Sequence, residues 1–75
     1  MMMDASTSNS CLEQIGQTAG LVWHALDKHG PLSLAKLTKS VDAPRDLVMQ
    51  AVGWLAREDK VWIEDTKRVR TIRLR

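Results

Sequence analysis

The basic side chains at the C-terminal end of the sequence are the residues with the clearest chemistry. The last nine of the 75 residues hold five basic residues and no acidic one: Lys67, Arg68, Arg70, Arg73 and Arg75. Lysine and arginine clusters of this kind are typical of domains that bind a polyanion such as nucleic acid. If about four phosphates are engaged, the logarithm of the affinity should fall with the logarithm of the salt concentration at a slope of about −3.6. The alternative is that these charges protect an edge strand from pairing with other chains.

The net charge of the chain hides this cluster. The formal total is only +2, but residues 1–42 sum to −1 and residues 43–75 to +3. The charge asymmetry therefore lies within the C-terminal half, and it predicts that any polyanion binds there.

A second set of candidate residues belongs to a helix expected over residues 44–58. With its apolar positions inward, Arg45, Gln50 and Arg57 point outward. An arginine there could contact guanine or phosphate, and the amide of Gln50 has the paired donor and acceptor that adenine recognition uses. Asp46 would oppose phosphates, and the neighbouring outward positions are weakly polar and equally suited to a protein contact: Met49, Gly53 and Ala56.

Catalytic and metal sites are not expected. His24 and His29 lie about 140° apart around an ideal helix, so they cannot share a metal ion. Cys11 is the single cysteine, and the sequence contains no catalytic triad order, paired carboxylates or glycine-rich phosphate loop. A chain of this size also struggles to enclose a substrate pocket. We therefore expect a binding protein with no enzymatic activity, cofactor, metal or small-molecule substrate.

The N-terminal ten residues predict a tail and not a targeting signal. They are polar and serine-rich, with neither a basic nor an apolar signal-peptide region. No apolar run approaches the roughly 18 residues of a membrane span. We expect a disordered tail over residues 1–10, one domain over residues 11–75, a cytoplasmic location and no membrane partner.

Three helices and a hairpin must position the candidate residues. The first helix should begin after an N-cap at Asn9 or Ser10 and end at Gly30 before a proline. Its apolar stripe has helical spacing and contains Leu12, Ile15, Ala19, Val22, Trp23 and Leu26. A stub strand at Leu32 and an N-cap at Ser33 should precede a short second helix, and Pro44 suits the first position of the third.

Two alternating segments at the C-terminal end predict a β-hairpin. Residues 61–64 and 70–74 read as strands, and a turn at Thr66-Lys67 would place Val61 opposite Ile72. The inner face of the hairpin, toward the core, would hold the apolar side chains of Val61, Ile63, Ile72 and Leu74. Trp62 on the other face could form a stacking or dimer surface, or could be half-buried under Arg73 in a cation–π contact, and we expect the half-buried state.

The order of these elements predicts a mainly helical α+β domain, a winged helix-turn-helix with three helices, a stub strand and a C-terminal hairpin wing. The runs Ala19–Trp23, His29–Ser33 and Ala51–Lys60 resemble a small winged helix-turn-helix family of bacteria and archaea whose activity is not established. The resemblance covers residues 11–65 and implies the fold without implying an activity. The sequence departs from the family in its strongly basic second wing strand.

Two functions remain open on the sequence. The first is a DNA-binding module that contacts double-stranded DNA through the third helix and the basic wing. The second is a protein-interaction or dimerisation module of the same fold without DNA binding, with the apolar contacts Leu21, Met49, Trp62 and Val69. A titration with duplex DNA at two salt concentrations distinguishes them.

Overall fold

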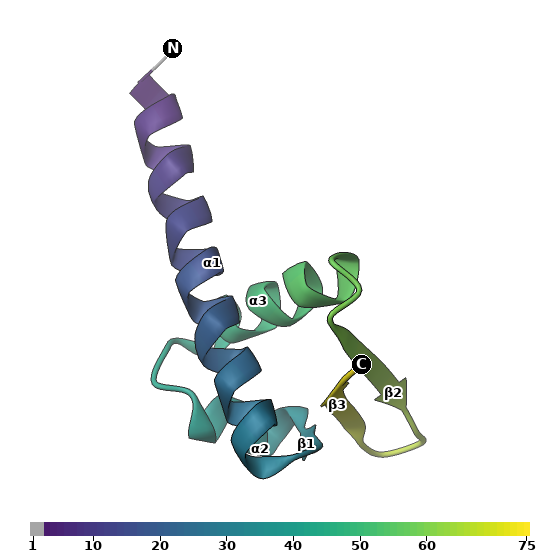
Figure 1. Ribbon diagram of the computed structural model, residues 1–75. Coiled ribbons are helices and arrows are strands. Elements are labelled where there is room, and N and C mark those ends of the chain that lie inside the picture. The colour runs from purple at the N-terminus through teal and green to yellow at the C-terminus, as the bar shows by residue number, and fades with distance from the viewer. Residues whose placement is uncertain (1–2) are drawn as a thin grey trace.

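The computed structural model describes residues 3–75, with side chains described from residue 10 onward. Its elements are α1 (Met3–His29), β1 (Leu32–Ser33), α2 (Leu34–Ser40), α3 (Arg45–Arg57), β2 (Val61–Asp65) and β3 (Arg70–Leu74) (Figure 1). The three strands form an antiparallel sheet in the order β1-β3-β2. The predicted winged helix-turn-helix, mainly helical and of the α+β class, is confirmed.

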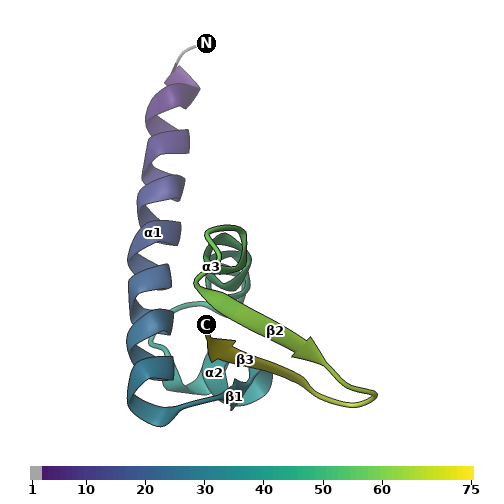
Figure 2. The same ribbon diagram turned by 45° about the vertical axis from the view of Figure 1, so that its right-hand side comes forward.

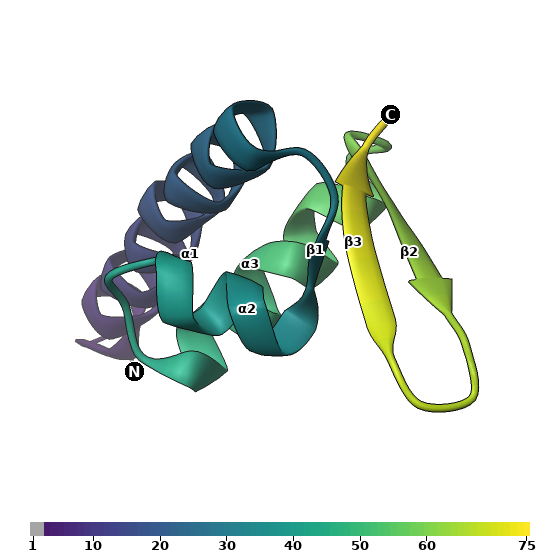
Figure 3. The ribbon, with the colours of Figure 1, turned by 90° about the horizontal axis from the view of Figure 1, so that it is seen from below.

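The hydrophobic core lies between the three helices and the sheet. Figure 3 shows the helices on one side and the sheet on the other, with β1 beside β3. Every helix and two strands contribute buried apolar side chains: Ala19, Val22, Leu26, Leu37, Val41, Val48, Ala51, Val52, Leu55, Val61 and Ile72. The most extensive contact joins α1 and α3, which follows from the helical spacing of small and branched side chains on both.

The ends of the helices follow local backbone chemistry. Gly30 has a φ of 80°, and its N–H donates to the carbonyl of Leu26 at 2.8 Å, so the predicted glycine stop after α1 is confirmed. The hydroxyl of Ser33 accepts a hydrogen bond from the N–H of Lys36 at 3.2 Å, which confirms this N-cap of α2. Pro44 is the N-cap of α3 and not its first residue, one position from the prediction.

Loss of the Ser33 cap should cost measurable stability. We expect Ser33→Ala to lower the free energy of unfolding by about 1 kcal/mol, because the N–H of Lys36 loses its acceptor at the start of a seven-residue helix. Thermal unfolding followed by circular dichroism measures the change. Ser40→Ala, at the exposed end of the same helix, is the control and should shift stability by less than about 0.5 kcal/mol. Equal losses in both variants would contradict a specific cap.

The hairpin register differs from the predicted one by two residues. Val61 pairs with Leu74 and Ile63 with Ile72. The connection is the four-residue segment 66–69, in which the N–H and hydroxyl of Thr66 both donate to the carbonyl of Val69. Because side chains alternate with a period of two, this shift leaves every side chain on its predicted face.

The register shift changes which arginine covers Trp62. The guanidinium of Arg75 lies 4.5 Å from the ring centroid, whereas Arg73 pairs with Glu64 at 3.1 Å, so the predicted Arg73 contact is wrong. Trp62 pairs directly with Arg73, and the arginine over its ring comes from the diagonal position two residues further along the chain. With the observed register, this diagonal residue is Arg75. The predicted half-burial of Trp62 is confirmed, with 48% of the residue exposed.

The N-terminal half of α1 projects from the domain (Figures 1 and 2). Because the helix begins at Met3, both Asn9 and Ser10 lie inside it, and the predicted N-cap is wrong. Residues 3–10 continue the helix where the composition predicts a disordered tail; residues 1 and 2 lie outside the described residues. The division into a tail and a domain stays a prediction.

Three residues of the predicted core stripe of α1 are not fully buried: Leu12, Ile15 and Trp23. Leu12 is 52% exposed and Trp23 is 37% exposed, whereas Ala19, Val22 and Leu26 on the same stripe are buried. Leu12 is exposed because it belongs to the half of α1 that projects beyond the core (Figure 1). Trp23 instead lines the edge of a hollow between α1 and α3.

Candidate nucleic-acid interface

A hollow opens between α2, the start of α3 and the wing, which we define as β2, β3 and their connection. Its lining residues are Ser33, Leu34, Ala35, Thr38, Lys39, Arg45, Arg68, Val69 and Arg70. Four of these are basic, and none of the described residues that line it is acidic. Such a concentration of cations, of which only Arg70 has an ion-pair partner among the described residues, favours binding of an anion such as phosphate.

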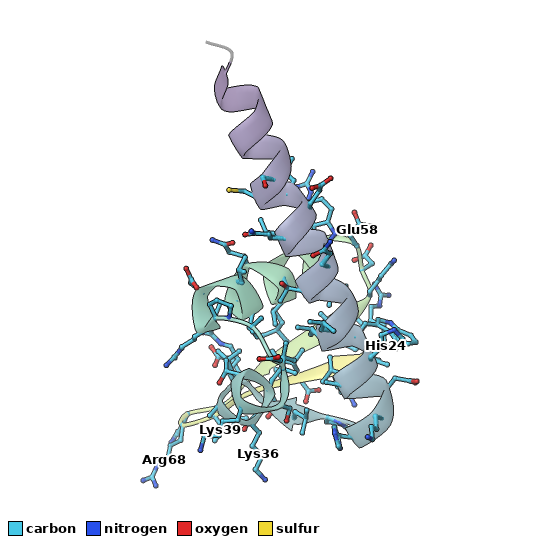
Figure 4. All side chains as sticks on the ribbon, turned by 90° about the vertical axis from the view of Figure 1, so that its left-hand side faces the viewer. His24, Lys36, Lys39, Glu58 and Arg68 are labelled. Carbon is cyan, nitrogen blue, oxygen red and sulfur yellow. The ribbon has the colours of Figure 1, made fainter. Side chains whose placement is uncertain are left out.

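Three elements supply these cations because of how the sheet is joined. The pairing of Ser33 with Thr71 holds the start of α2 against β3, whose first residue is Arg70. Figure 4 shows Lys36, Lys39 and Arg68 at the same end of the molecule, with their side chains directed outward. We call this group of five side chains the basic end: Lys36, Lys39, Arg45, Arg68 and Arg70.

Most of the charge at the basic end is directed to solvent. Within residues 10–75, the ion pairs of the structure involve Arg70, Arg73 and Arg75. Arg70 pairs with Asp65 at 3.3 Å, and both side chains are at least half-exposed, so the pair is a weak, solvent-screened one. The other four cations of the basic end are therefore open to an external anion.

The structure brings together only some of the residues predicted as nucleic-acid contacts. Arg45, Arg68 and Arg70 line the hollow, while Gln50 and Lys67 are exposed but do not line it. Arg57 ends α3, twelve residues or about 18 Å from Arg45.

Arg73 lies on the opposite face of the sheet from Arg70. Strand residues alternate between faces, and Arg73 pairs with Glu64 beside Trp62. It therefore takes no part in the hollow.

Sequence analysis missed Lys36 and Lys39. Both lie on α2, three residues apart and so on one face of the helix. Their signal was the position of α2 itself, since the first helix of a helix-turn-helix crosses the nucleic-acid backbone.

An apolar groove continues from the basic end along α3. It is lined by Leu34, Met49, Val52, Gly53, Ile63, Arg70 and Ile72, and shares Leu34 and Arg70 with the basic hollow. Met49 and Ile63 are 43% and 42% exposed. Ile63 was expected in the core, but it pairs with Ile72 on an edge strand where no helix covers it fully. The face of α3 toward the wing thus presents few donors and acceptors for base edges.

The residues of the alternative protein contact do not form one surface. Met49 lines the apolar groove and Val69 the basic hollow, whereas Leu21 lines a separate depression beside the end of α2. Trp62 lies on the other face of the sheet, under Arg75. All four are nevertheless between 43% and 48% exposed.

Comparison with known proteins identifies the family. The sequence profile of the family described as Winged helix-turn-helix domain (DUF2582) matches residues 8–74. The chain belongs to this family. The resemblance noted in the sequence is therefore confirmed, and so is the fold that it implies.

Two known proteins are similar in sequence to this member of the winged helix-turn-helix family. Uncharacterized protein MJ1608 of Methanocaldococcus jannaschii is 40% identical over 53 residues, which cover 67% of this chain and 74% of the relative. The solution NMR structure of protein BT2368 from Bacteroides thetaiotaomicron superposes with a TM-score of 0.74 at 39% identity, covering 83% of this chain and 76% of that one.

Membership of the DUF2582 family bears on function only coarsely. Winged-helix domains are typically non-enzymatic and often bind DNA or proteins, and the fold alone does not decide between them. Among residues 10–75, whose side chains the structure describes, no cluster of three or more histidine, cysteine, aspartate or glutamate side chains could hold a metal ion. None of the described helices is both long enough and apolar enough to cross a membrane.

Proposed function

We propose that this domain binds double-stranded DNA through the phosphate backbone, using the basic end, and acts by binding alone, without catalysis or a cofactor. The observation that carries the proposal is the meeting of four cations from α2, α3 and the wing around one open hollow, with Lys36 at the same end of the molecule. We also propose a cytoplasmic location, which suits the free thiol of Cys11.

Backbone contacts explain the arrangement of the basic end. Lys36 and Lys39 lie on the helix that crosses the backbone in helix-turn-helix proteins, and Arg45 begins the helix that follows it. Arg68 lies in the connection of the wing, on the far side of the hollow from α2. A phosphate strand that lies along the hollow would meet cations from both sides.

We expect little discrimination between base sequences. The outward face of α3 carries Asp46, Met49, Gln50 and Gly53, of which only Gln50 offers the paired donor and acceptor of base recognition. Phosphate contacts position a protein on DNA but carry no sequence information.

Salt dependence and chemical-shift mapping test the proposal together. Four or five phosphate contacts predict a slope of log affinity against log salt of about −3.6 to −4.5, or about a 150- to 500-fold loss between 50 and 200 mM salt. We expect two labelled duplexes of unrelated sequence to bind alike, and amide shifts to concentrate at Lys36, Lys39 and Arg68. Absence of binding at 50 mM salt, or shifts confined to the face of Trp62 and Arg73, would contradict it.

The apolar groove supports a second candidate function, a protein-interaction module without DNA binding. Exposed Met49 and Ile63 beside the cations of the basic end would suit an amphipathic, acidic peptide. This function is favoured if duplex DNA fails to bind at 50 mM salt and such a peptide shifts the methyl resonances of both residues.

A further inference from the structure

A second hollow lies between α1 and α3, and shares no lining residue with the basic hollow or the apolar groove. It is lined by Gly16, Ala19, Gly20, Trp23, His24, Trp54, Leu55 and Lys60. Trp23 and Trp54 are partly exposed at its edges, and Leu12 is exposed on the projecting half of α1. The hollow is of mixed polarity, with His24 and Lys60 among its lining residues, and large apolar side chains exposed beside it are typical of an interaction site.

The edge of α1 beside this hollow has the spacing of a coiled-coil seam, in which Leu12, Gly16 and Trp23 are exposed and Ala19 is buried but lines the hollow. Leu12, Gly16, Ala19 and Trp23 follow one another at intervals of four, three and four residues. The large side chains lie at the two ends of this seam and the small ones in its middle. At Gly16 and Gly20 no atom lies within 4 Å of the position that a Cβ would take, so another backbone can approach there.

The order of sizes along the seam fits a second copy in the opposite direction. In the reverse chain direction, the side chains of the seam again follow the order large, small, small, large. An antiparallel α1 would therefore place Leu12 against the partner's Trp23 and Gly16 against the partner's Ala19, and the reverse on the other side. This is the condition for a two-fold symmetric, self-complementary interface.

The charges at the two ends of the seam are complementary. Glu13 follows Leu12 at one end, whereas the charged side chain that lines the hollow beside Trp23 at the other end is Lys60. Neither Glu13 nor Lys60 takes part in an ion pair among the residues whose side chains the structure describes. In an antiparallel pair, each Glu13 would lie near Lys60 of the partner subunit.

We propose that two copies of this chain associate through α1, antiparallel, along the seam of Leu12, Gly16, Ala19 and Trp23. The interface covers the hollow between α1 and α3 and leaves both basic ends open, so the proposal stands independently of DNA binding. It also differs from the dimer contact that the sequence predicts, which would involve Leu21, Met49, Trp62 and Val69.

Sedimentation equilibrium of two glycine variants tests the interface. Gly16→Gln adds a side chain that meets nothing in the monomer but would intrude between the two helices. We expect it to weaken association by about 10- to 100-fold, with helix content retained. Gly53→Gln, an equally open glycine on α3, is the matched control and should associate like the wild type. A monomeric wild type at millimolar concentration, or equal effects of both variants, would overturn the proposal.

Cross-linking tests the orientation. In a Cys11→Ser background, one chain carries Leu12→Cys and another Trp23→Cys. An antiparallel seam brings these two positions together, whereas identical positions lie about 16 Å apart along the axis, beyond disulfide reach. We expect a disulfide-linked dimer from the mixture and none from either chain alone. Cross-linking of a single variant with itself, or none in the mixture, would overturn the antiparallel arrangement.

Discussion

Reversing three charges of the basic end, with Lys36→Glu, Lys39→Glu and Arg68→Glu together, is expected to reduce the affinity for duplex DNA by at least about 500-fold at 100 mM salt. Each phosphate contact contributes about eightfold at this salt concentration through counterion release, and three are lost. Repulsion between the new carboxylates and the phosphates adds to the loss. Fluorescence anisotropy with a labelled duplex measures the change.

A second triple variant separates the location of the charge from its amount. Lys28→Glu, Arg57→Glu and Arg73→Glu change the net charge by the same amount, at exposed positions outside the basic hollow. We expect this variant to retain most of the affinity at 100 mM salt, where charges more than about 10 Å from a phosphate are largely screened. Equal losses in both triple variants would mean that the domain attracts DNA only through its net charge, and would contradict a defined interface.

Shortening Ile72 to alanine is expected to have the largest effect on stability. Ile72 is fully buried in β3, the central strand, where it pairs with Leu32 on one side and Ile63 on the other. The substitution removes three buried carbon atoms and leaves a cavity, at a cost of about 3–4 kcal/mol. In a small domain this lowers the melting temperature by about 15–25 °C. Denaturant and thermal unfolding measure both quantities.

Ile63→Ala is the matched control for this loss. Ile63 is the same residue type, directly across the strand pair, but 42% exposed. We expect it to cost only about 1 kcal/mol, because less surface is removed from the core and solvent fills the gap. Similar losses of stability at the two positions would contradict the difference in burial between Ile72 and Ile63.

The sequence determined the elements of this protein because their signals are local. Gly30 stops α1 through its positive φ and Ser33 caps α2 through its own hydroxyl, and neither depends on distant residues. The period of the apolar residues identified the faces of α3 and of both hairpin strands. A pairing error of two residues left these faces unchanged, since alternation fixes the face but not the partner.

The tertiary structure decided where those faces meet. The crossing of α1 and α3 left Leu12 and Trp23 exposed on a stripe whose spacing predicts burial, because helical period shows which side is apolar and not how far a partner extends. The pairing of β1 with β3 set two unremarkable lysines of α2 beside Arg68 and Arg70. These residues are about thirty positions apart in the chain, so only folding could combine their charges into one surface.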